Sequence, residues 1–115
     1  MTDLSFLNNS GRMRYEALAG EETAGRAYWV DAPDCERPER IFFHTEVDDA
    51  FEGQGVASQL VRFALDDAIE HGFRIVPVCP YVKSWLQKHE DYAPHAIAIN
   101  PRHLEAVRAR QHRDG

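Results

Sequence analysis

The chain has 115 residues, of which 43% are hydrophobic, and it carries a formal net charge of −6. This length is enough for one globular domain, residues 1–115, with a hydrophobic core of its own. The acidic balance argues against nucleic-acid binding through a broad basic surface, and no apolar run in the sequence is long enough to span a membrane.

The first half of the chain has the short runs and turn residues of an antiparallel sheet. Runs rich in aromatic and β-branched residues are separated by turn residues such as Asn9-Ser10-Gly11. The sequence predicts four strands, over 3–9, 12–18, 22–31 and 40–47. A surface loop over 32–39 is expected before the last of these strands. The last strand is expected to be buried on both faces near its start.

A crossover helix follows. Apolar residues from Val56 to Ile69 recur at helical spacing, and Gly72 marks the end of this helix. The next predicted strand covers 74–78. A helix that joins two neighbouring strands of one sheet makes them parallel, so 40–47 and 74–78 should form one parallel pair in an antiparallel sheet.

The end of the chain is expected to be mostly helical. The sequence predicts a helix over 80–88 and then, over 89–99, a loop with some extended structure. A polar terminal helix should begin at Pro101, with Asn100 as its cap, and reach about Gln111. The arginines of this helix are expected to be solvated: Arg108, Arg110 and Arg113.

A glycine turn precedes the crossover helix. Gly53, Gly55 and the small Ala57 let the backbone bend sharply and leave its N–H groups uncovered, beside the positive end of the helix dipole. This arrangement suits a pyrophosphate. The longer glycine fingerprint of dinucleotide-binding folds and the Gly-Lys-Ser/Thr of a P-loop are both missing.

Four motifs follow one another along the chain: His44-Thr45-Glu46-Val47; Glu52-Gly53-Gln54-Gly55-Val56-Ala57-Ser58 with Leu60-Val61; Val76-Pro77-Val78-Cys79-Pro80-Tyr81-Val82; and His89-Glu90-Asp91-Tyr92. This ordered set resembles the small YjdJ-type branch of the GCN5-related N-acetyltransferase superfamily. The resemblance covers about 12–92 and leaves 100–115 as a terminal helix and tail. It implies an α/β (α+β) fold with a mixed, mostly antiparallel sheet, a splayed parallel strand pair and flanking helices.

The resemblance also implies an acetyl-coenzyme A site. The pantetheine arm would lie between the splayed strands and pair with backbone near Glu46 and Val47, and Pro77 would help to keep that gap open. Glu52 stands where the family has Arg or Gln, so phosphate binding would rest on the backbone. Lys83, Arg62 and Lys88 are candidates for the 3′-phosphate, although solvated charge explains each alone better. The implied cofactor-binding residues are Val47, Gly53, Gln54, Gly55, Val56, Ala57, Ser58 and Lys83.

Acetyl transfer to an amine needs a neutral nucleophile, an oxyanion-stabilising donor and a proton for the departing thiolate. The Tyr that many family members use for that proton falls on Leu86 here, which leaves Tyr81 as the nearest replacement and Tyr92 as the second. His44 and Glu46 are two apart and share a strand face. Glu46 could orient His44 to take the amine proton; the alternative is a pair satisfied by its neighbours.

Cys79 is the fourth candidate catalytic residue, because in this branch the Cys of the Cys-Pro motif lies near the thioester. Pro80 suits a first helical position, so Cys79 would be the N-cap, where the helix dipole favours a thiolate. An acyl-cysteine intermediate, a thiol hydrogen-bonded to the acetyl group and a small buried hydrophobe all remain open. Cys35 is the only other cysteine, too few for a disulfide framework. With no leader-like segment, we expect reduced thiols and a cytoplasmic location.

Several residues are assigned ordinary structural roles. Five histidines without paired helical spacing are expected to be scattered over the surface, and we expect no metal site: His71, His89, His95, His103 and His112. The large aromatic residues should form the core or the wall of an acceptor groove: Tyr28, Trp29, Phe42, Phe43 and Trp85.

The leading functional hypothesis is transfer of an acetyl group from acetyl-coenzyme A to the amine of a small molecule, a peptide or a protein. The missing Tyr favours an alternative, a module that binds coenzyme A or acyl-coenzyme A with little or no catalysis. A structural domain without a ligand is the third possibility.

Overall fold

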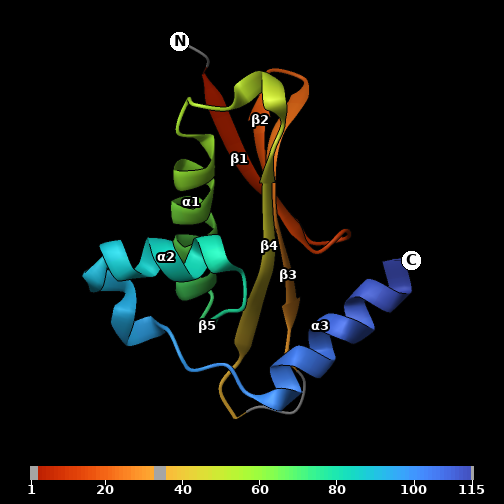
Figure 1. The fold of residues 1–115 in the computed structure, drawn as a ribbon, viewed down its shortest axis with the longest axis vertical. Coiled ribbons are helices and arrows are strands. Elements are labelled where there is room, and N and C mark those ends of the chain that lie inside the picture. Colours follow the sequence, from red (N-terminus) through yellow and green to blue (C-terminus); the bar gives the residue numbers. More distant parts are fainter. Residues whose placement is uncertain (1–2, 33–35, 115) are drawn as a thin grey trace.

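The computed structural model describes residues 3–32 and 36–114, so the expectation about Cys35 lies outside the described residues. One sheet has its strands in sequence order (Figure 1): β1 (Leu4–Asn9), β2 (Arg14–Ala19), β3 (Glu22–Asp31), β4 (Glu39–Val47) and β5 (Arg74–Pro77). The pairs from β1 to β4 are antiparallel, and β4 and β5 are parallel. The predicted mixed sheet with one parallel pair is confirmed.

The helical elements are η1 (Asp49–Phe51), α1 (Val56–Glu70), α2 (Pro80–Lys88), η2 (Glu90–His95) and α3 (Pro101–Asp114). As predicted, α1 is the crossover between β4 and β5, and Gly72 follows its end with a φ of 85°. The predicted cap of α3 is also present, because Asn100 Oδ1 accepts bonds from the backbone N–H groups of Arg102 and His103. None of the described helices is long and apolar enough to cross a membrane.

Some boundaries differ from prediction. β2 begins at Arg14, because the preceding turn closes through bonds from the Arg12 and Met13 N–H groups to the carbonyls of Asn9 and Ser10. The segment over 89–99 is predicted as a loop with some extended structure; it contains the 3-10 helix η2, which was not predicted, and its extended part follows. It then pairs with β5 through an isolated bridge from Ala96 to Ile75.

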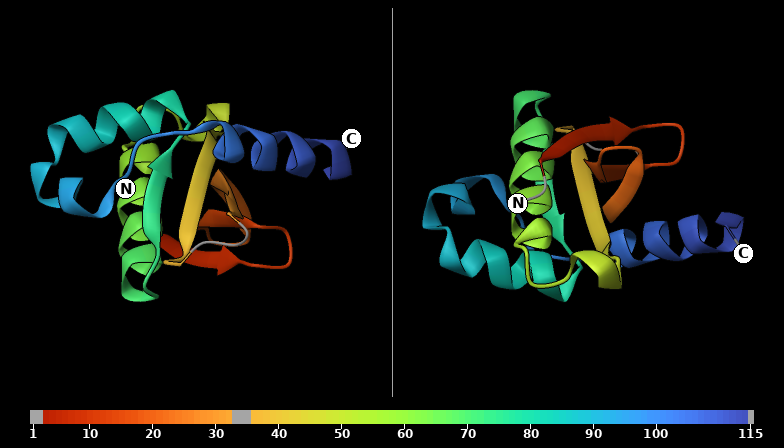
Figure 2. Two further views of the ribbon diagram at one scale, coloured as in Figure 1. Left: turned by 90° about the horizontal axis from the view of Figure 1, so that it is seen from below. Right: turned by 90° about the horizontal axis from the view of Figure 1, so that it is seen from above.

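The helices cover the two faces of the sheet unequally. α1 and α2 lie on one face and α3 on the other, as the end-on views show (Figure 2). The face under α1 carries the larger core, with these side chains almost fully buried: Tyr15, Phe42, Leu60, Val61, Leu65 and Ile75. Under α3 a smaller cluster joins Val107 to β3, β4 and β5 through Val30, Ile41 and Val76.

Two expectations about α3 and the histidines are wrong. His103 is 0% exposed and hydrogen-bonds Glu39 Oε1 at 2.8 Å, so it is not a surface histidine. Arg110 is 2% exposed and donates to the Arg12 carbonyl at 2.7 Å, so it is not solvated. Both side chains are long enough to pack their apolar parts against the sheet while their polar ends bond to partners at its edge.

The start of β4 is buried on both faces, as predicted, and one of its buried residues is a cation. The Arg40 guanidinium lies 3.8 Å from the Trp29 ring centroid and 4.1 Å from that of Phe73. It also donates to Asp31 and to the Tyr15 hydroxyl. Burial lowers the pKa of Arg40, but these partners outweigh burial and raise it above its ordinary value. The group is therefore a permanent charge held inside the larger core.

Candidate functional site

β4 changes its neighbours halfway along. Its first half, from Glu39 to Phe42, is paired with β5. β5 then ends at Pro77, and the Cys79 N–H gives the Phe42 carbonyl a last bond of 2.8 Å before the chain turns into α2. Within the described residues, the rest of β4 is paired only with β3. Its outer edge over 43–47 is where an extended ligand could bind as an added strand.

A bulge marks the point of change. In the β3–β4 register Trp29 faces Phe42 and Tyr28 faces His44, so Phe43 is the extra residue on β4. The Tyr28 ring contacts the rings of both Phe43 and His44. The bulge therefore turns two successive side chains of β4 toward Tyr28, on the face of the sheet that α3 partly covers.

The glycine turn between η1 and α1 forms a cavity of about 220 Å³ at the end of β4. Gly53 and Gly55 have φ values of 79° and 72°, in the left-handed region that other residues rarely adopt. None of the N–H groups from Gly53 to Ser58 bonds to an acceptor in the described part of the chain. The N–H groups in the first turn of α1 also lack an acceptor within the helix, because no preceding helical turn provides a carbonyl for them.

Most of the predicted phosphate residues line this cavity, together with residues from η1 and α2. The lining consists of Val47, Phe51, Glu52, Gly53, Gly55, Val56, Ala57, Ser58 and Tyr81. Gln54 and Lys83 are exposed outside this lining. Ser58 also accepts a bond from the Trp85 indole at 3.1 Å, which ties the turn to α2.

Cys79 is the N-cap residue of α2, as predicted, but its thiol makes no capping bond. The side chain is only 4% exposed and belongs to the larger hydrophobic core. Its sulfur lies 3.5 Å from the Oγ1 atom of Thr45, which is in the half of β4 that does not pair with β5. The thiol is therefore close to the open strand edge, while its burial suits the packing role that the sequence left open.

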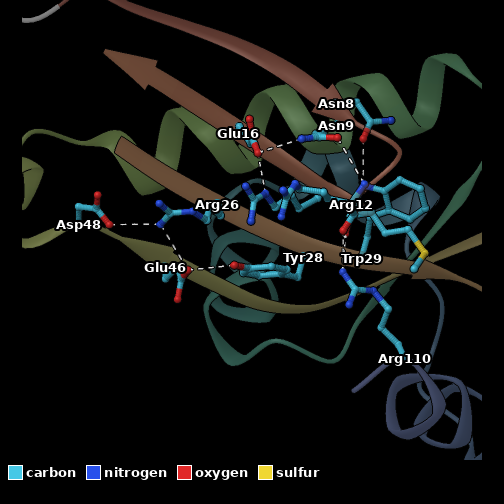
Figure 3. Close-up of polar contacts among 12 residues, drawn as sticks. Asn8, Asn9, Arg12, Glu16, Arg26, Tyr28, Trp29, Glu46, Asp48 and Arg110 are labelled. Carbon is cyan, nitrogen blue, oxygen red and sulfur yellow. Dashed lines mark hydrogen bonds and ion pairs between the residues drawn. The ribbon is translucent and has the colours of Figure 1, made fainter. Parts of the chain in front are cut away.

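His44 and Glu46 come together on the exposed side of β4. His44 Nε2 lies 3.3 Å from Glu46 Oε2, and the two side chains are 55% and 42% exposed. Glu46 Oε1 accepts bonds from the Tyr28 hydroxyl at 3.1 Å and from Arg26 at 3.4 Å (Figure 3). Arg26 also bonds Asp48 at 3.2 Å. Glu46 is thus fixed from two sides and presents its second oxygen to His44.

Tyr92, the second candidate for proton donor, has a structural partner. Its hydroxyl donates to Asp66 at 2.6 Å and accepts from Arg62 at 3.4 Å. Burial and the bond to Asp66 raise the pKa of Tyr92 above its usual value, although Arg62 acts in the opposite direction. These bonds tie η2 to α1. Arg62, a candidate for the 3′-phosphate, is engaged in the same contact and packs near the Trp85 ring.

Sequence reasoning missed Arg26 beside the predicted pair and Thr45 beside the Cys79 sulfur, and it left the role of Tyr28 open. The signal was the register of β3 against β4. With it, Arg26 faces Glu46 and Tyr28 faces His44, and opposite charges facing each other across strands are a recognisable pattern. Among the described residues, no group of three or more His, Cys, Asp or Glu side chains is arranged to hold a metal ion.

The chain is similar to several known proteins. The family model described as GCN5-related N-acetyl-transferase matches residues 14–95. A GCN5-like putative N-acetyltransferase from Staphylococcus aureus has a similar fold, with a TM-score of 0.62 and 22% identity, over 88% of this chain and 95% of that one. A ribosomal-protein-alanine N-acetyltransferase from Brucella melitensis biovar Abortus 2308 gives 0.53 and 21%, over 76% and 62%.

A curated relative matches a shorter stretch. Protein NATD1 of Bos taurus is 37% identical over 46 residues, which are 40% of this chain and 41% of that protein. The match therefore spans less than half of the relative's length. The family model, in contrast, covers most of the chain, including the glycine turn and both halves of β4. By that match, this chain belongs to the GCN5-related N-acetyltransferase family.

Proposed function

We propose that this protein transfers the acetyl group of acetyl-coenzyme A to the nitrogen of an amine acceptor. The observation that carries the proposal is the open edge of β4 over 43–47. At one end of this edge is the glycine-turn cavity, and along it lie His44 and Glu46. A binding edge and a proton acceptor on one strand, with a phosphate turn beyond the end of that strand, are the parts that such a transfer needs.

The residues present fit the coenzyme. A Cβ added at Gly53 would meet nothing within 4 Å, so a phosphate can approach the backbone of the turn closely. The N–H groups from Gly53 to Ser58 would hold the pyrophosphate, and the edge over 43–47 would pair with the amides of the pantetheine arm. Bound there, acetyl-coenzyme A supplies a thioester whose carbonyl is open to attack by an amine.

His44 is proposed to take the proton of the attacking amine. The N–C bond forms as the C–S bond breaks, and the proton that leaves nitrogen passes to His44 Nε2 or to the Glu46 oxygen beside it. Tyr28 and Arg26 keep Glu46 in place, so they act as positioning residues. The exposure of His44 supports this role, because an acceptor can reach it from solvent.

The departing thiolate needs a proton, and Tyr81 is proposed to supply it. Tyr81 is 40% exposed in the first turn of α2, two residues after Cys79, whose sulfur lies beside Thr45 near the open edge of β4. Cys79 is the alternative participant. Because its sulfur is buried, we favour direct transfer, with Cys79 packing beside Thr45, over an acyl-cysteine relay. A Cys79→Ala variant that retains its rate of transfer would exclude the relay.

A second function has one observation in its favour. Leu86 stands where the family resemblance places the usual proton donor, and it is a buried member of the larger core. It cannot donate a proton. A module that binds coenzyme A or acyl-coenzyme A without catalysis is therefore the alternative.

Membership of the YjdJ-type branch and a cytoplasmic location are further proposals.

Release of coenzyme A thiol, measured with acetyl-coenzyme A and a panel of amines, tests the leading proposal. We expect amine-dependent release and an N-acetylated product of matching mass. Tight binding of coenzyme A without turnover of any amine would establish the binding module instead. Coenzyme A at ten times its dissociation constant should stabilise the fold by about 1.4 kcal/mol. Absence of that stabilisation would contradict both functions.

A further inference from the structure

A second cavity, of about 440 Å³, is lined by the turn that joins β1 to β2, by Tyr28 of β3 and by Arg110 of α3. Three arginines, one tyrosine and two turn residues line it: Arg12, Arg14, Arg110, Tyr28, Gly11 and Met13. No acidic residue is among the described residues of this lining. The cavity is thus locally cationic in a chain whose net charge is −6.

The cavity is held by specific contacts. Arg110 reaches from α3 to the turn, where it donates to the Arg12 and Met13 carbonyls at 2.7 and 3.4 Å (Figure 3). Met13 has a φ of 51°, a left-handed conformation that is uncommon for a residue other than glycine. Its carbonyl also accepts the Trp29 N–H at 3.1 Å. These bonds fix an unusual turn beside the cavity, so its shape does not depend on a freely moving loop.

The arginines around the cavity differ in their partners. Arg14 bonds Glu16 at 2.6 Å, and Arg26, just outside the lining, bonds Glu46 and Asp48. The Arg12 side chain is exposed and has no side-chain partner among the described residues. Its guanidinium can therefore turn to a ligand without breaking an ion pair. A guanidinium group binds carboxylate or phosphate oxygens through two parallel hydrogen bonds.

Tyr28 connects this cavity to the proposed active site. Tyr28 lines the cavity, and the Arg14 guanidinium lies 6.0 Å from the centroid of its ring. Its ring also lies 5.7 Å from that of His44, and its hydroxyl bonds Glu46. A ligand in the cavity would therefore be separated from the proton-accepting pair by a single side chain.

We propose that this cavity binds an anionic group, a carboxylate or a phosphate, of the acceptor whose amine reacts at His44. The preferred acceptors are then amines that carry such a group several bonds from the nitrogen. Arg12 is the specificity-determining residue, Arg14 adds positive charge while it stays bonded to Glu16, and Arg110 positions the turn that carries Arg12. This inference rests on the proposed acetyl transfer and names the acceptor class for that same site.

Acceptors built on a six-carbon chain test the inference. Hexylamine, 6-aminohexanoate and 6-aminohexyl phosphate carry a methyl group, a carboxylate and a phosphate at the far end, and kcat/KM for each is measured with saturating acetyl-coenzyme A. We expect the two anionic amines to exceed hexylamine by about tenfold or more, as a charge-assisted pair requires. The comparison of carboxylate with phosphate shows which anion the site prefers.

Arg12→Ala should remove this preference, so that the ratio of kcat/KM for each anionic amine to kcat/KM for hexylamine falls by about tenfold. Arg108→Ala, which removes an exposed arginine outside the cavity lining, is the charge-matched control and should retain the preference. Equal kcat/KM for all three amines, or a preference that survives Arg12→Ala, would overturn the inference while the proposed transfer stands.

A binding measurement separates the two proposals if no amine is acetylated. Titration calorimetry with 6-aminohexanoate and with inorganic phosphate should show binding to the unaltered protein that Arg12→Ala weakens by about tenfold and Arg108→Ala does not. Binding of that kind would support the anion site even though the transfer proposal had failed. No binding of either probe would overturn the anion site.

Discussion

The two halves of β4 differ in almost every physical respect. From Glu39 to Phe42 the strand has neighbours on both edges, and Arg40, Ile41 and Phe42 are buried. From Phe43 to Val47 its neighbour among the described strands is β3, on one edge, and its side chains are half-buried or exposed. The bulge at Phe43 and the end of β5 fall at the same place, so one strand serves as core first and as a candidate binding edge afterwards.

The difference shows how a small domain can place an open strand edge next to its core. An unpaired edge leaves backbone groups without partners, and the fold tolerates this only where a ligand or water can reach them. Because the first half is held rigidly on both sides, the second half is fixed in direction without being covered. The following four experiments test this division, beginning with the largest expected effect.

Removal of a side chain from the paired half should destabilise the whole fold. Phe42 is 1% exposed, and Phe42→Ala should lower the free energy of unfolding by about 3–5 kcal/mol, because it leaves a cavity in the larger core. Urea unfolding followed by circular dichroism measures the loss. Thr45→Ala, on the open half, is the comparison and should cost about 1 kcal/mol or less. Equal losses for the two variants would contradict the division of β4.

Removal of a side chain from the open half should affect the reaction and spare the fold. His44→Ala is expected to lower kcat about 100-fold, because the amine proton loses its acceptor, with the midpoint of urea unfolding unchanged. His95→Ala removes another exposed histidine and should leave both quantities unchanged. A kcat for His44→Ala within twofold of the unaltered protein would exclude His44 as the base.

The glycine turn at the end of β4 allows a test with matched strain. Gly55→Ala places a side chain at a φ of 72° and should cost about 1 kcal/mol of stability. It should also weaken coenzyme A binding about tenfold, because the N–H groups of the turn would shift. Gly72→Ala, at a φ of 85° after α1, carries similar strain away from the turn and should leave the dissociation constant unchanged. Equal weakening by both variants would show that strain alone is responsible.

The buried carboxylate of Glu16, on β2, should make a small contribution to stability that depends on pH. Burial raises the pKa of Glu16, but bonds from Arg14 and Asn9 outweigh burial and lower the pKa below its ordinary value. A lowered pKa in the folded state means stability that is present above the unfolded value and lost as the pH falls through the folded one. Glu16→Gln should therefore cost about 1 kcal/mol at pH 7 and almost nothing at pH 2.

Glu21→Gln, in the exposed turn between β2 and β3, provides the control for this titration and should cost little at either pH. Urea unfolding at the two pH values gives the required differences. A cost for Glu16→Gln that persists unchanged at pH 2 would mean that its contacts, and not its charge, stabilise the fold.

The sequence by itself determined the local features of this protein. Helical spacing between Val56 and Ile69 predicted α1, and a helix between two strands required a parallel pair. Gly53 and Gly55 predicted the turn, because only glycine adopts its backbone angles without strain. His44 and Glu46 were predicted on one face, because side chains two apart on a strand point the same way.

The tertiary structure decided everything that depends on partners distant in sequence. The bulge at Phe43 follows from the register of β3 against β4, and that register brings Tyr28 and Arg26 to Glu46. The sequence predicted that Arg110 would be solvated at a helix end, but in the folded protein it donates a hydrogen bond to the carbonyl of Arg12, 98 residues earlier in the chain. Periodicity and turn chemistry are local properties of the chain, whereas register and burial depend on which surfaces meet after it folds.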